Sequence, residues 1–407
     1  MSKHENKVPE VRFKGFMDDW EQRKLGDWIA PYTEKTDRNN QYPVLTSSRK
    51  GIFLQTDYYK GNQIASEDNT GYNIVPRGYF TYRHMSDDEI FKFNINNIVD
   101  YGIVSTLYPV FTTKEGLNCN FLQYQLNNGE EFQRYAILQK QGGSRTYMYL
   151  SKLEKLKLTI PELQEQIEIG NFFKQIDETI ALHQQKLDKL KQLKKGYMQV
   201  MFPSKGEEKP GIRFNNFNNS SWKQCKLGEL AEIVRGASPR PIQDPKWFDR
   251  NSDIGWLRIS DVTEQDGRIH YLEQRISTLS QEKTRVLNEP HLLLSIAATV
   301  GKPVVNYVKT GVHDGFLIFK NPNFHQEFMF QWLEMFRPKW QKYGQPGSQV
   351  NLNSELVRSQ EIKIPSFKEQ KKIGKFLKQL DETVALHKGK VEKLQSLKRV
   401  FLQKMFI

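Results

Sequence analysis

Few stretches of this sequence have the residue types and spacing that catalysis requires. Residues 297–302 read Ala-Ala-Thr-Val-Gly-Lys, which matches the end of a phosphate-binding loop. Such a loop needs a glycine five residues before Gly301, where the chain has Ile296, so the cradle of backbone N–H groups is incomplete. Glu361-Ile362-Lys363 matches the tail of a metal-dependent nuclease motif, but no suitable aspartate pair precedes it. Neither stretch predicts a catalytic site.

Sequence signatures of methyl transfer and of metal binding are absent as well. The sequence has no Asn-Pro-Pro-aromatic tetrad for amino methylation and no glycine-rich loop for a methyl donor. Its histidines and cysteines do not cluster with the spacing of metal ligands. We therefore predict no catalytic residue, no metal and no cofactor bound by this chain.

The charge of the chain indicates a polyanionic partner. Among 407 residues, 60 are Lys or Arg and 47 are Asp or Glu, which gives a net charge of +13. A phosphate backbone is the usual partner of such a protein, although charge that serves only solubility is the alternative. The segment 364–407 is the most basic, with 11 basic and 4 acidic residues.

Other features of the composition favour a globular protein of the cytoplasm. The length is enough for two or three domains, and 38% of the residues are hydrophobic. Cys119 and Cys225 are the only cysteines, which suits a reducing compartment. The first residues contain no apolar stretch of a secretion signal. The longest apolar run, 292–300, is too short to cross a membrane and predicts a buried strand.

An internal repeat organises the chain. Residues 160–202 and 364–406 align without a gap at an offset of 204, and 23 of 43 positions are identical. Each copy is predicted to be one long helix that Pro161 or Pro365 opens. Ser366 and Glu369 have the spacing of a capping box at the start of the second helix.

Both predicted helices carry an apolar seam with alternating steps of four and three residues, which is typical of a coiled coil. The predicted seam consists of Ile169, Phe173, Ile176, Ile180, His183, Leu187 and Leu190 on the first helix, and of Ile373, Leu377, Leu380, Val384, His387, Val391 and Leu394 on the second. Each seam is then expected to step by three, to Leu193 or Leu397. We expect the two seams to pack on each other in antiparallel orientation. A buried, hydrogen-bonded histidine is favoured over a metal ligand at His183 and His387.

The repeat extends to short motifs that precede each domain. Arg12-Phe13 and Phe16 correspond to Arg213-Phe214 and Phe217, and Trp20 with Lys24-Leu25-Gly26 corresponds to Trp222 with Lys226-Leu227-Gly228. The resulting plan has five parts: a first domain at 1–159, a first long helix at 160–202, a linker at 203–212, a second domain at 213–363 and a second long helix at 364–407.

Both domains are predicted to be mixed α/β (α+β). Strands are predicted at 42–45, 79–82, 103–111, 256–259, 291–295, 304–308 and 316–319, and helical pieces near 120–126 and 327–336. The two domains share this pattern but little sequence.

The repeated motifs resemble those of the specificity subunit of Type I restriction–modification enzymes. The resemblance rests on the paired motifs before each domain and on the duplicated helices, with Gln166, Gly170 and Asp177-Glu178-Thr179 matched by Gln370, Gly374 and Asp381-Glu382-Thr383. It covers essentially the whole chain and is weak only inside the two domains, which vary in this family.

The resemblance implies a non-catalytic, DNA-reading role. Each domain would be a target-recognition domain that reads one half of a bipartite DNA sequence, while the antiparallel helices would set the spacing and dock two methyltransferase subunits. Those partner subunits would use S-adenosylmethionine, and a further restriction and translocase subunit would use ATP and Mg. The alternative is a coiled-coil adaptor that binds protein without reading DNA.

Polar and basic residues at strand ends and in glycine-containing loops are the predicted DNA contacts, because Arg can read guanine, Asn or Gln can read adenine, and Ser, Thr and Lys mostly hold phosphate. In the first domain they are Thr46, Ser47, Ser48, Arg49, Lys50, Arg83, Ser144, Arg145 and Thr146. In the second domain they are Arg258, Ser260, Asp261, Ser295, Thr299, Lys302, Ser348, Gln349 and Asn351.

Overall fold

The computed structural model describes residues 8–62, 64–140, 145–204, 206–218, 220–340 and 352–407. They form two compact units, one made of Met1–Gln184 with Gly389–Ile407 and the other of Gln185–Lys388. Each unit therefore combines one mixed α/β domain with one segment of each long helix, α5 (Leu163–Val200) and α11 (Phe367–Lys404). The predicted fold class, with mixed domains and two long helices from an internal repeat, is confirmed.

The domain of the first unit is built from short antiparallel strands and three-residue to ten-residue helical pieces. Its strands are β1 (Glu21–Lys24), β2 (Ile29–Pro31), β3 (Leu45–Ser48), β4 (Gly51–Leu54), β5 (Asn73–Pro76), β6 (Phe80–Thr81), β7 (Met85–Ser86), β8 (Asn94–Ile95), β9 (Tyr101–Val104), β10 (Val110–Thr113), β11 (Thr146–Tyr147) and β12 (Lys157–Ile160). Its helices are η1 (Leu25–Asp27), α1 (Gln55–Tyr58), α2 (Cys119–Asn128), α3 (Glu130–Leu138) and α4 (Leu150–Leu153). The largest sheet has the order β2-β10-β6-β8, and the pairs β1–β12, β3–β4, β5–β9 and β7–β11 stand beside it.

The domain of the second unit has larger sheets. Its strands are β13 (Lys223–Lys226), β14 (Glu232–Arg235), β15 (Gly255–Trp256), β16 (Arg268–Ile269), β17 (Arg285–Leu287), β18 (Leu292–Ser295), β19 (Pro303–Asn306), β20 (Thr310–Val312), β21 (Phe316–Lys320) and β22 (Glu361–Ile364). Its helices are η2 (Asn215–Phe217), α6 (Leu227–Leu230), η3 (Pro245–Trp247), α7 (Ile259–Glu264), α8 (Thr278–Gln281), α9 (Gln326–Trp340) and α10 (Ser354–Ser359). The sheet orders are β14-β21-β18-β19-β16, β15-β20-β17 and β13-β22.

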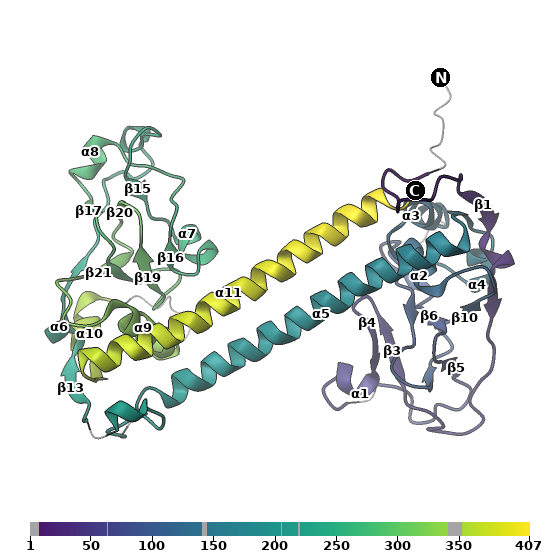
Figure 1. The fold of residues 1–407 in the computed structure, drawn as a ribbon, viewed down its shortest axis with the longest axis horizontal. Helices are drawn as coiled ribbons and strands as arrows, with labels where there is room; N and C mark the ends of the chain where they lie inside the picture. Colours follow the sequence, from purple (N-terminus) through teal and green to yellow (C-terminus); the bar gives the residue numbers. More distant parts are fainter. Residues whose placement is uncertain (1–7, 63, 141–144, 205, 219, 341–351) are drawn as a thin grey trace. The chain divides into compact units, whose positions relative to one another are not determined.

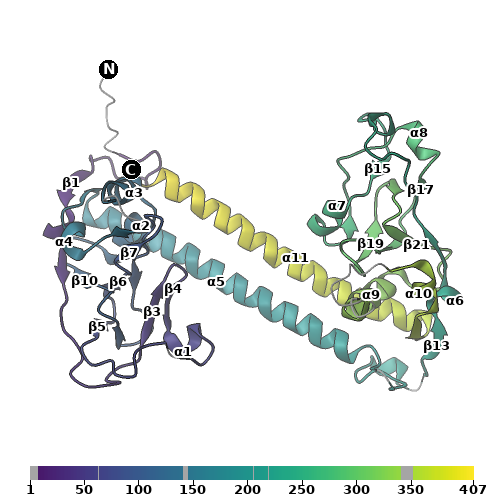
Figure 2. The same ribbon diagram turned by 180° about the vertical axis from the view of Figure 1, so that it is seen from behind.

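The long helices belong to the hydrophobic cores of both units. In the first unit, α2 and α3 lie against the start of α5 and the end of α11 (Figures 1 and 2). Phe173 of α5 and Phe406, which follows α11, stack there with ring centroids 5.7 Å apart. In the second unit, Tyr197 of α5 meets Phe376 of α11 at 4.9 Å. In the first unit, Phe172 meets Phe401 and the later residue Asp177 meets the earlier residue Lys398. In the second unit, Lys194 meets Asp381 and Tyr197 meets Phe376. A rising residue number on α5 therefore meets a falling number on α11 within each unit, so the segments are antiparallel.

All residues of the predicted seam are buried or partly buried within their unit. Ile169, Phe173, Ile176, Leu187, Ile373, Leu377, His387 and Val391 are buried, and Ile180, His183, Leu190, Leu380, Val384 and Leu394 are partly buried. Both seam histidines have interaction partners. Among the described residues, no group of three His, Cys, Asp or Glu side chains could hold a metal ion.

The predicted three-residue step at the end of each seam is wrong. Leu193 and Leu397 are 48% and 46% exposed. The alternation of four and three instead continues through Lys194 and Tyr197 of α5 to Met201 just after it, and through Lys398 and Phe401 of α11 to Met405 just after it. A lysine can occupy a seam position because each one pairs with an aspartate of the other helix, Lys194 with Asp381 and Lys398 with Asp177.

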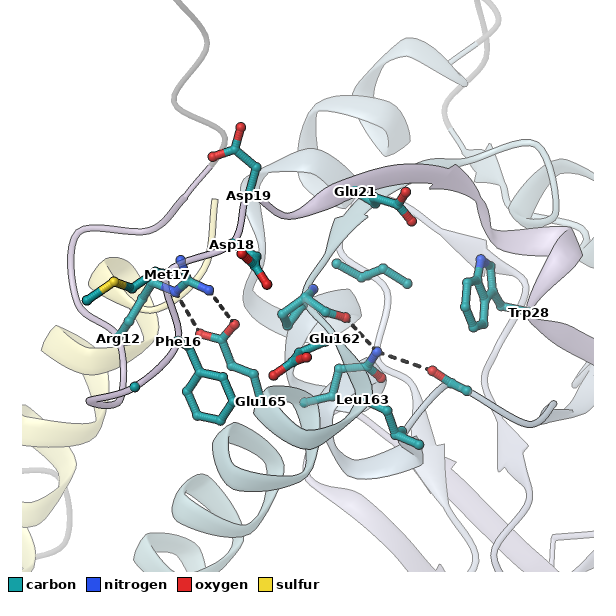
Figure 3. Close-up of a pocket in the computed structure, with 15 residues that line it drawn as sticks. Arg12, Phe16, Met17, Asp18, Asp19, Glu21, Trp28, Glu162, Leu163 and Glu165 are labelled. Carbon is teal, nitrogen blue, oxygen red and sulfur yellow. Dashed lines mark hydrogen bonds and ion pairs between the residues drawn. The ribbon is translucent and has the colours of Figure 1, made fainter.

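A buried ion pair joins each repeated N-terminal motif to the start of a long helix. Arg12 donates two hydrogen bonds to Glu165 at 2.9 and 2.7 Å, and the Glu165 side chain is fully buried (Figure 3). Arg213 makes the same two bonds to Glu369 at the same distances. The Glu369 carboxylate therefore accepts hydrogen bonds from Arg213 and not from the backbone N–H of Ser366, as the expected capping box would require. Removing one partner of a buried pair typically costs about 3–5 kcal/mol.

Two further repeated residues fix each domain on its helix. Gln166 donates to Pro161 O at 2.9 Å and accepts from the backbone N–H of Asn118 at the N-cap of α2. Gln370 makes the equivalent bonds to Pro365 O and from the backbone N–H of His325. The repeated residues of the sequence therefore hold the domains to the helices.

Several predicted strands differ from the observed ones because turns interrupt them. The predicted strand 103–111 is two strands, β9 and β10, with a turn in which Tyr108 N donates to Ser105 O. The apolar run 292–300 leaves β18 after Ser295, since Gly301 N donates back to Ser295 O. Predicted strand 42–45 begins only at Leu45, and predicted strand 256–259 ends at Trp256 because Ile259 begins α7.

Gly170→Ala should destabilise the protein, because an added Cβ would lie 2.9 Å from both Asn118 Oδ1 and the backbone N of Phe121. We expect a loss of about 1–3 kcal/mol, the usual cost of overpacking. Gly196→Ala on the same helix is the control, because nothing lies within 4 Å of its Cβ position and alanine favours a helix by about 1 kcal/mol. Thermal or urea unfolding measures both. Equal stability of the two variants would contradict the close packing of α5 on α2.

Candidate nucleic-acid interface

Six of the predicted DNA contacts of the first domain line one cavity of about 360 Å³, named the first cavity here. The cavity lies where the hairpin β3–β4 approaches α1 and the loops around β7. The sequence-predicted lining residues are Thr46, Ser47, Ser48, Arg49, Lys50 and Arg83. A hairpin tip and two loops thus bring residues together that lie more than thirty positions apart in the chain.

The cations of the first cavity differ in how they are bound. Arg49 donates to Asp88 Oδ2 at 2.8 Å, and this hydrogen bond raises the pKa of Arg49 and is the main cause of the lowered pKa of Asp88. Lys50 and Arg83 are exposed and make no ion pair with any described residue. Lys50 and Arg83 can therefore take a phosphate without giving up a partner.

The predicted hydroxyl residues divide into two bonded serines and two threonines, Thr46 and Thr146, whose Oγ1 atoms have no partner among the described residues. Ser47 is 5% exposed and donates to Thr81 O, while Ser48 donates to Gly51 O across the hairpin. Thr146 is 1% exposed in β11. Thr46 is partly buried, and its Oγ1 has no hydrogen-bond partner among the described residues.

The remaining predicted residues of the first domain lie at the same edge or outside the described part. Arg145 is exposed and donates to Asp87 Oδ1 at 2.9 Å, and Asp87 lines the first cavity. Ser144 lies outside the described residues. Arg145 uses Nε for this bond, so its terminal nitrogens can still donate to an anion near the first cavity.

Three predicted contacts of the second domain gather at the start of α7. Arg258 is the N-cap residue and donates to Asp261 Oδ1 at 2.9 Å, while Asp261 is 3% exposed and Ser260 is exposed. Arg258 also lines a cavity of about 290 Å³, named the second cavity, with Ser238, Arg240, Ile242, Trp256, Ile259, His313 and Asp314. Asp261 is thus a partner of Arg258 rather than a residue on the surface.

Two other predicted residues of the second domain, Ser295 and Thr299, stabilise the turn between β18 and β19. Ser295 is fully buried and donates to Ala297 O, and Thr299 donates to Ser295 Oγ. Burial lowers the pKa of Lys302, but Glu334 and Asp266, the latter at 2.6 Å, outweigh burial and raise it. Ser348, Gln349 and Asn351 lie outside the described residues.

Sequence reasoning missed several residues of both cavities. Tyr58, Tyr59, Lys92 and Tyr108 line the first cavity, and burial raises the pKa of Tyr108 while the charge of nearby Arg83 opposes that rise. In the second cavity, Arg240 is 74% exposed in its side chain and pairs with Asp314 at 2.7 Å. Burial lowers the pKa of His313, which favours its neutral form. The Tyr58-Tyr59 pair and the arginine of Pro239-Arg240-Pro241 were the available signals.

The two cavities differ in the groups that they offer to a ligand. The first combines basic side chains with tyrosines, and the second combines two arginines with a tryptophan, a histidine and an aspartate. Arginine can donate to guanine or phosphate, and aromatic rings can contact bases or sugars. No helix in the described part of the chain is long and apolar enough to cross a membrane.

Both halves of the chain match one protein family model. The model is described as the Type I restriction modification DNA specificity domain, and it matches residues 17–192 and 219–396. The chain is 22% identical over 413 residues to the putative type I restriction enzyme MjaX specificity subunit of Methanocaldococcus jannaschii. It is 24% identical to the type I restriction enzyme MjaVIII specificity subunit of the same organism over 420 residues. Each alignment covers 94% of this chain and 91% of the relative.

Solved structures share the fold at low sequence identity. The S subunit of a Type I restriction–modification system from M. genitalium matches with a TM-score of 0.62 and 13% identity, covering 98% of this chain and 99% of that chain. A chain from a structural study of complex assembly and conformational transition of the type I R-M system matches with a TM-score of 0.53 and 17% identity, covering 95% of this chain and 97% of the other.

Arg83→Gln should weaken binding of duplex DNA about equally for all sequences, because a free cation at the rim of a cavity acts on phosphate. We expect the slope of log K against log salt to fall by about one unit. Arg77→Gln is the matched control: Arg77 is exposed in the same domain but pairs with Asp100 and does not line the cavity. Fluorescence anisotropy with random-sequence duplexes at several salt concentrations measures the effect. An equal loss in both variants would remove the first cavity from the interface.

Proposed function

Because the chain belongs to the Type I restriction–modification DNA specificity family, we propose that it reads a split DNA target, one half with each domain. The observation that carries this proposal is the repeat itself: the family model matches twice, once over each domain and its long helix. An adaptor that binds only protein is not retained, since both halves match a DNA specificity domain.

The different cavities of the two domains support two different half-sites. The first domain offers Lys50 and Arg83 beside tyrosines, whereas the second offers Arg240 and Arg258 beside His313. The long helices, in contrast, are identical at 23 of 43 aligned positions of the two repeats. Base contacts set which sequence is read, and contacts to the phosphates set only register and affinity. The domains would therefore define the sequence and the helices the spacer between its halves.

We further propose that two copies of one methyltransferase subunit dock on the long helices. Exposed apolar side chains recur at equivalent positions of the two repeats: Leu182 and Leu386 are 62% and 57% exposed, and Leu163 and Phe367 are 43% and 57% exposed. Apolar side chains on a polar helix surface often mark a protein interface. Their presence at the same positions of both repeats supports two equal docking sites for one kind of partner.

Catalysis and its cofactors would belong to the partners. The methyltransferase subunits would bind S-adenosylmethionine, and restriction and translocase subunits would bind ATP and Mg²⁺. On this chain, the lysine of the stretch that matches a phosphate loop, Lys302, is taken by Asp266 and Glu334, so it does not point to a nucleotide site. The assembly would act on DNA in the cytoplasm.

Exchanging residues 24–150 for the corresponding segment of a relative should change one half of the recognised sequence and leave the other half intact. The reason is that base contacts come from each domain separately. Methylation mapping across a genome, in a host that carries the methyltransferase partner, measures the outcome. A change of both half-sites together would contradict independent reading.

The purified chain alone should transfer no methyl group from labelled S-adenosylmethionine.

Leu182→Glu and Leu386→Glu should each remove one of two bound methyltransferase subunits, and the double variant should bind none. A buried charge in an apolar contact costs several kcal/mol, which is enough to abolish a typical interface. Mass photometry of the assembled complex counts the subunits. Leu279→Glu is the control, because Leu279 is 55% exposed in α8 of the second domain. Two bound subunits in the double variant would rule out these docking sites.

A further inference from the structure

In the first unit, one aspartate of a long helix contacts the other long helix and the recognition domain at once. Asp177 of α5 accepts a hydrogen bond from Tyr124 of α2 at 2.7 Å and from Lys398 of α11 at 2.5 Å. The ammonium group of Lys398 also lies over the ring of Tyr124, at 5.3 Å from its centroid. These three residues form what we name the Asp177 hub.

An equivalent hub exists in the second unit. Asp381 of α11 pairs with Lys194 of α5 and accepts from Gln331 of α9 at 2.6 Å. Arg268 of β16 approaches the same carboxylate at 3.4 Å while it binds Glu327 through both of its terminal nitrogens. We name Asp381, Lys194, Gln331 and Arg268 the Asp381 hub.

The two hubs share their helix residues but not their domain residues. Asp177 and Asp381 are equivalent in the repeat, as are Lys194 and Lys398, so each hub takes its aspartate from one helix and its lysine from the other. The domains contribute unrelated side chains, Tyr124 in one hub, and Gln331 with Arg268 in the other. The same Asp–Lys pair of the helices thus binds different side chains in the two domains. A protein whose recognition domains vary on constant helices needs such a contact.

Partial burial makes the hub contacts stronger than surface ion pairs. The side chains of Lys194 and Asp381 are 17% and 21% exposed, and those of Lys398 and Asp177 are 23% and 42% exposed. Burial and the hydrogen bond to Asp177 raise the pKa of Tyr124, so its hydroxyl stays a donor. Hydrogen bonds to charged groups contribute more to stability than bonds between neutral groups. The hubs can therefore hold a domain in one orientation.

The Asp177 hub lies next to the first cavity. Lys92 lines that cavity, and its pKa is lowered first by burial and then by the charge of Lys398, while Asp177 acts in the opposite direction. The hub residues and Lys92 therefore interact electrostatically. In the second unit, Arg268 opens β16, which packs against α7, the helix that begins beside Arg258 of the second cavity. The Asp177 hub therefore neighbours a residue that lines the first cavity, and the Asp381 hub is connected to the second cavity through β16 and α7.

We propose that Asp177 and Asp381 are positioning residues that fix the orientation of each recognition domain on the long helices and thereby the spacer length that the protein accepts. This inference rests on the proposed function, because it presupposes a target of two halves. The hub residues do not line either cavity. They should therefore affect the distance between the two half-sites and not the bases that each domain recognises.

The test uses the full chain in its assembled complex with the methyltransferase subunits, with wild type, Asp177→Asn and Asp381→Asn compared. Asparagine keeps the size of the side chain but removes the charge that Lys398 or Lys194 needs. Methylation rates are measured on duplexes with the wild-type spacer and with spacers one base pair shorter or longer. We expect the preference for the wild-type spacer to fall at least about tenfold, which is about 1.4 kcal/mol. Base preference within each half should stay unchanged.

Glu178→Gln and Glu382→Gln are the matched controls. Each substitution removes one negative charge from the residue that directly follows the hub aspartate, and Glu178 and Glu382 are equivalent in the repeat. Both carboxylates are exposed and lie outside the hubs. These variants should keep the wild-type spacer preference. If they relax it as much as the asparagine variants do, the effect is one of net charge and the proposal is wrong.

A purely structural role predicts a different result. It would lower the melting temperature and reduce methylation on all spacers in the same proportion, and that outcome overturns the proposal, as does any change in base preference. Where an asparagine variant does not fold, Tyr124→Phe and Gln331→Met remove only the domain side of each hub, and they must also relax the spacer preference. A wild-type complex without a two-part target would refute the proposed function itself, whereas an unaltered preference in folded variants refutes only the positioning role.

Discussion

Buried and partly buried ion pairs between charged side chains hold each domain to the long helices, and the rest of the structure depends on them. Glu165 and Glu369 are fully buried and satisfied by Arg12 and Arg213, which come from the motif that precedes each domain. A buried carboxylate without a partner is very unfavourable, so these contacts fix one arrangement of motif, helix and domain. The same principle explains why lysines can occupy seam positions: each one faces an aspartate of the opposite helix.

The structure separates residues that build the protein from residues that can read a ligand. The repeated positions, including Gln166, Gly170 and their counterparts Gln370 and Gly374, are occupied by contacts between domain and helix. Side chains that differ between the repeats, such as Arg83 and Arg240, lie at cavities. This division suits a protein whose helices remain constant while its recognition domains vary.

Many polar residues that a strand-end pattern marks as readers are used for folding instead. Ser295 is fully buried and Asp261 is almost fully buried, and both side chains are hydrogen-bonded. Since a buried polar group must find a partner, polar residues next to strands are often parts of turns and caps. Lys50 and Arg83, which pair with no acid in the described part of the chain, are therefore stronger candidates for DNA contacts than the hydroxyl residues near them.

The sequence alone determined the repeat, the two long helices, the mixed domains and the family, because periodicity and repeated motifs are local properties of the chain. The predicted seam positions through Leu190 and Leu394 are buried or partly buried. The sequence misplaced the ends of the seams, since a hydrophobic pattern cannot show that Lys194 and Lys398 are neutralised by aspartates more than 180 residues away. Only the tertiary structure brought Arg83 and Lys92 to the hairpin that carries Arg49. It alone also decided which serines and threonines are buried, because burial depends on contacts between segments that no local pattern encodes.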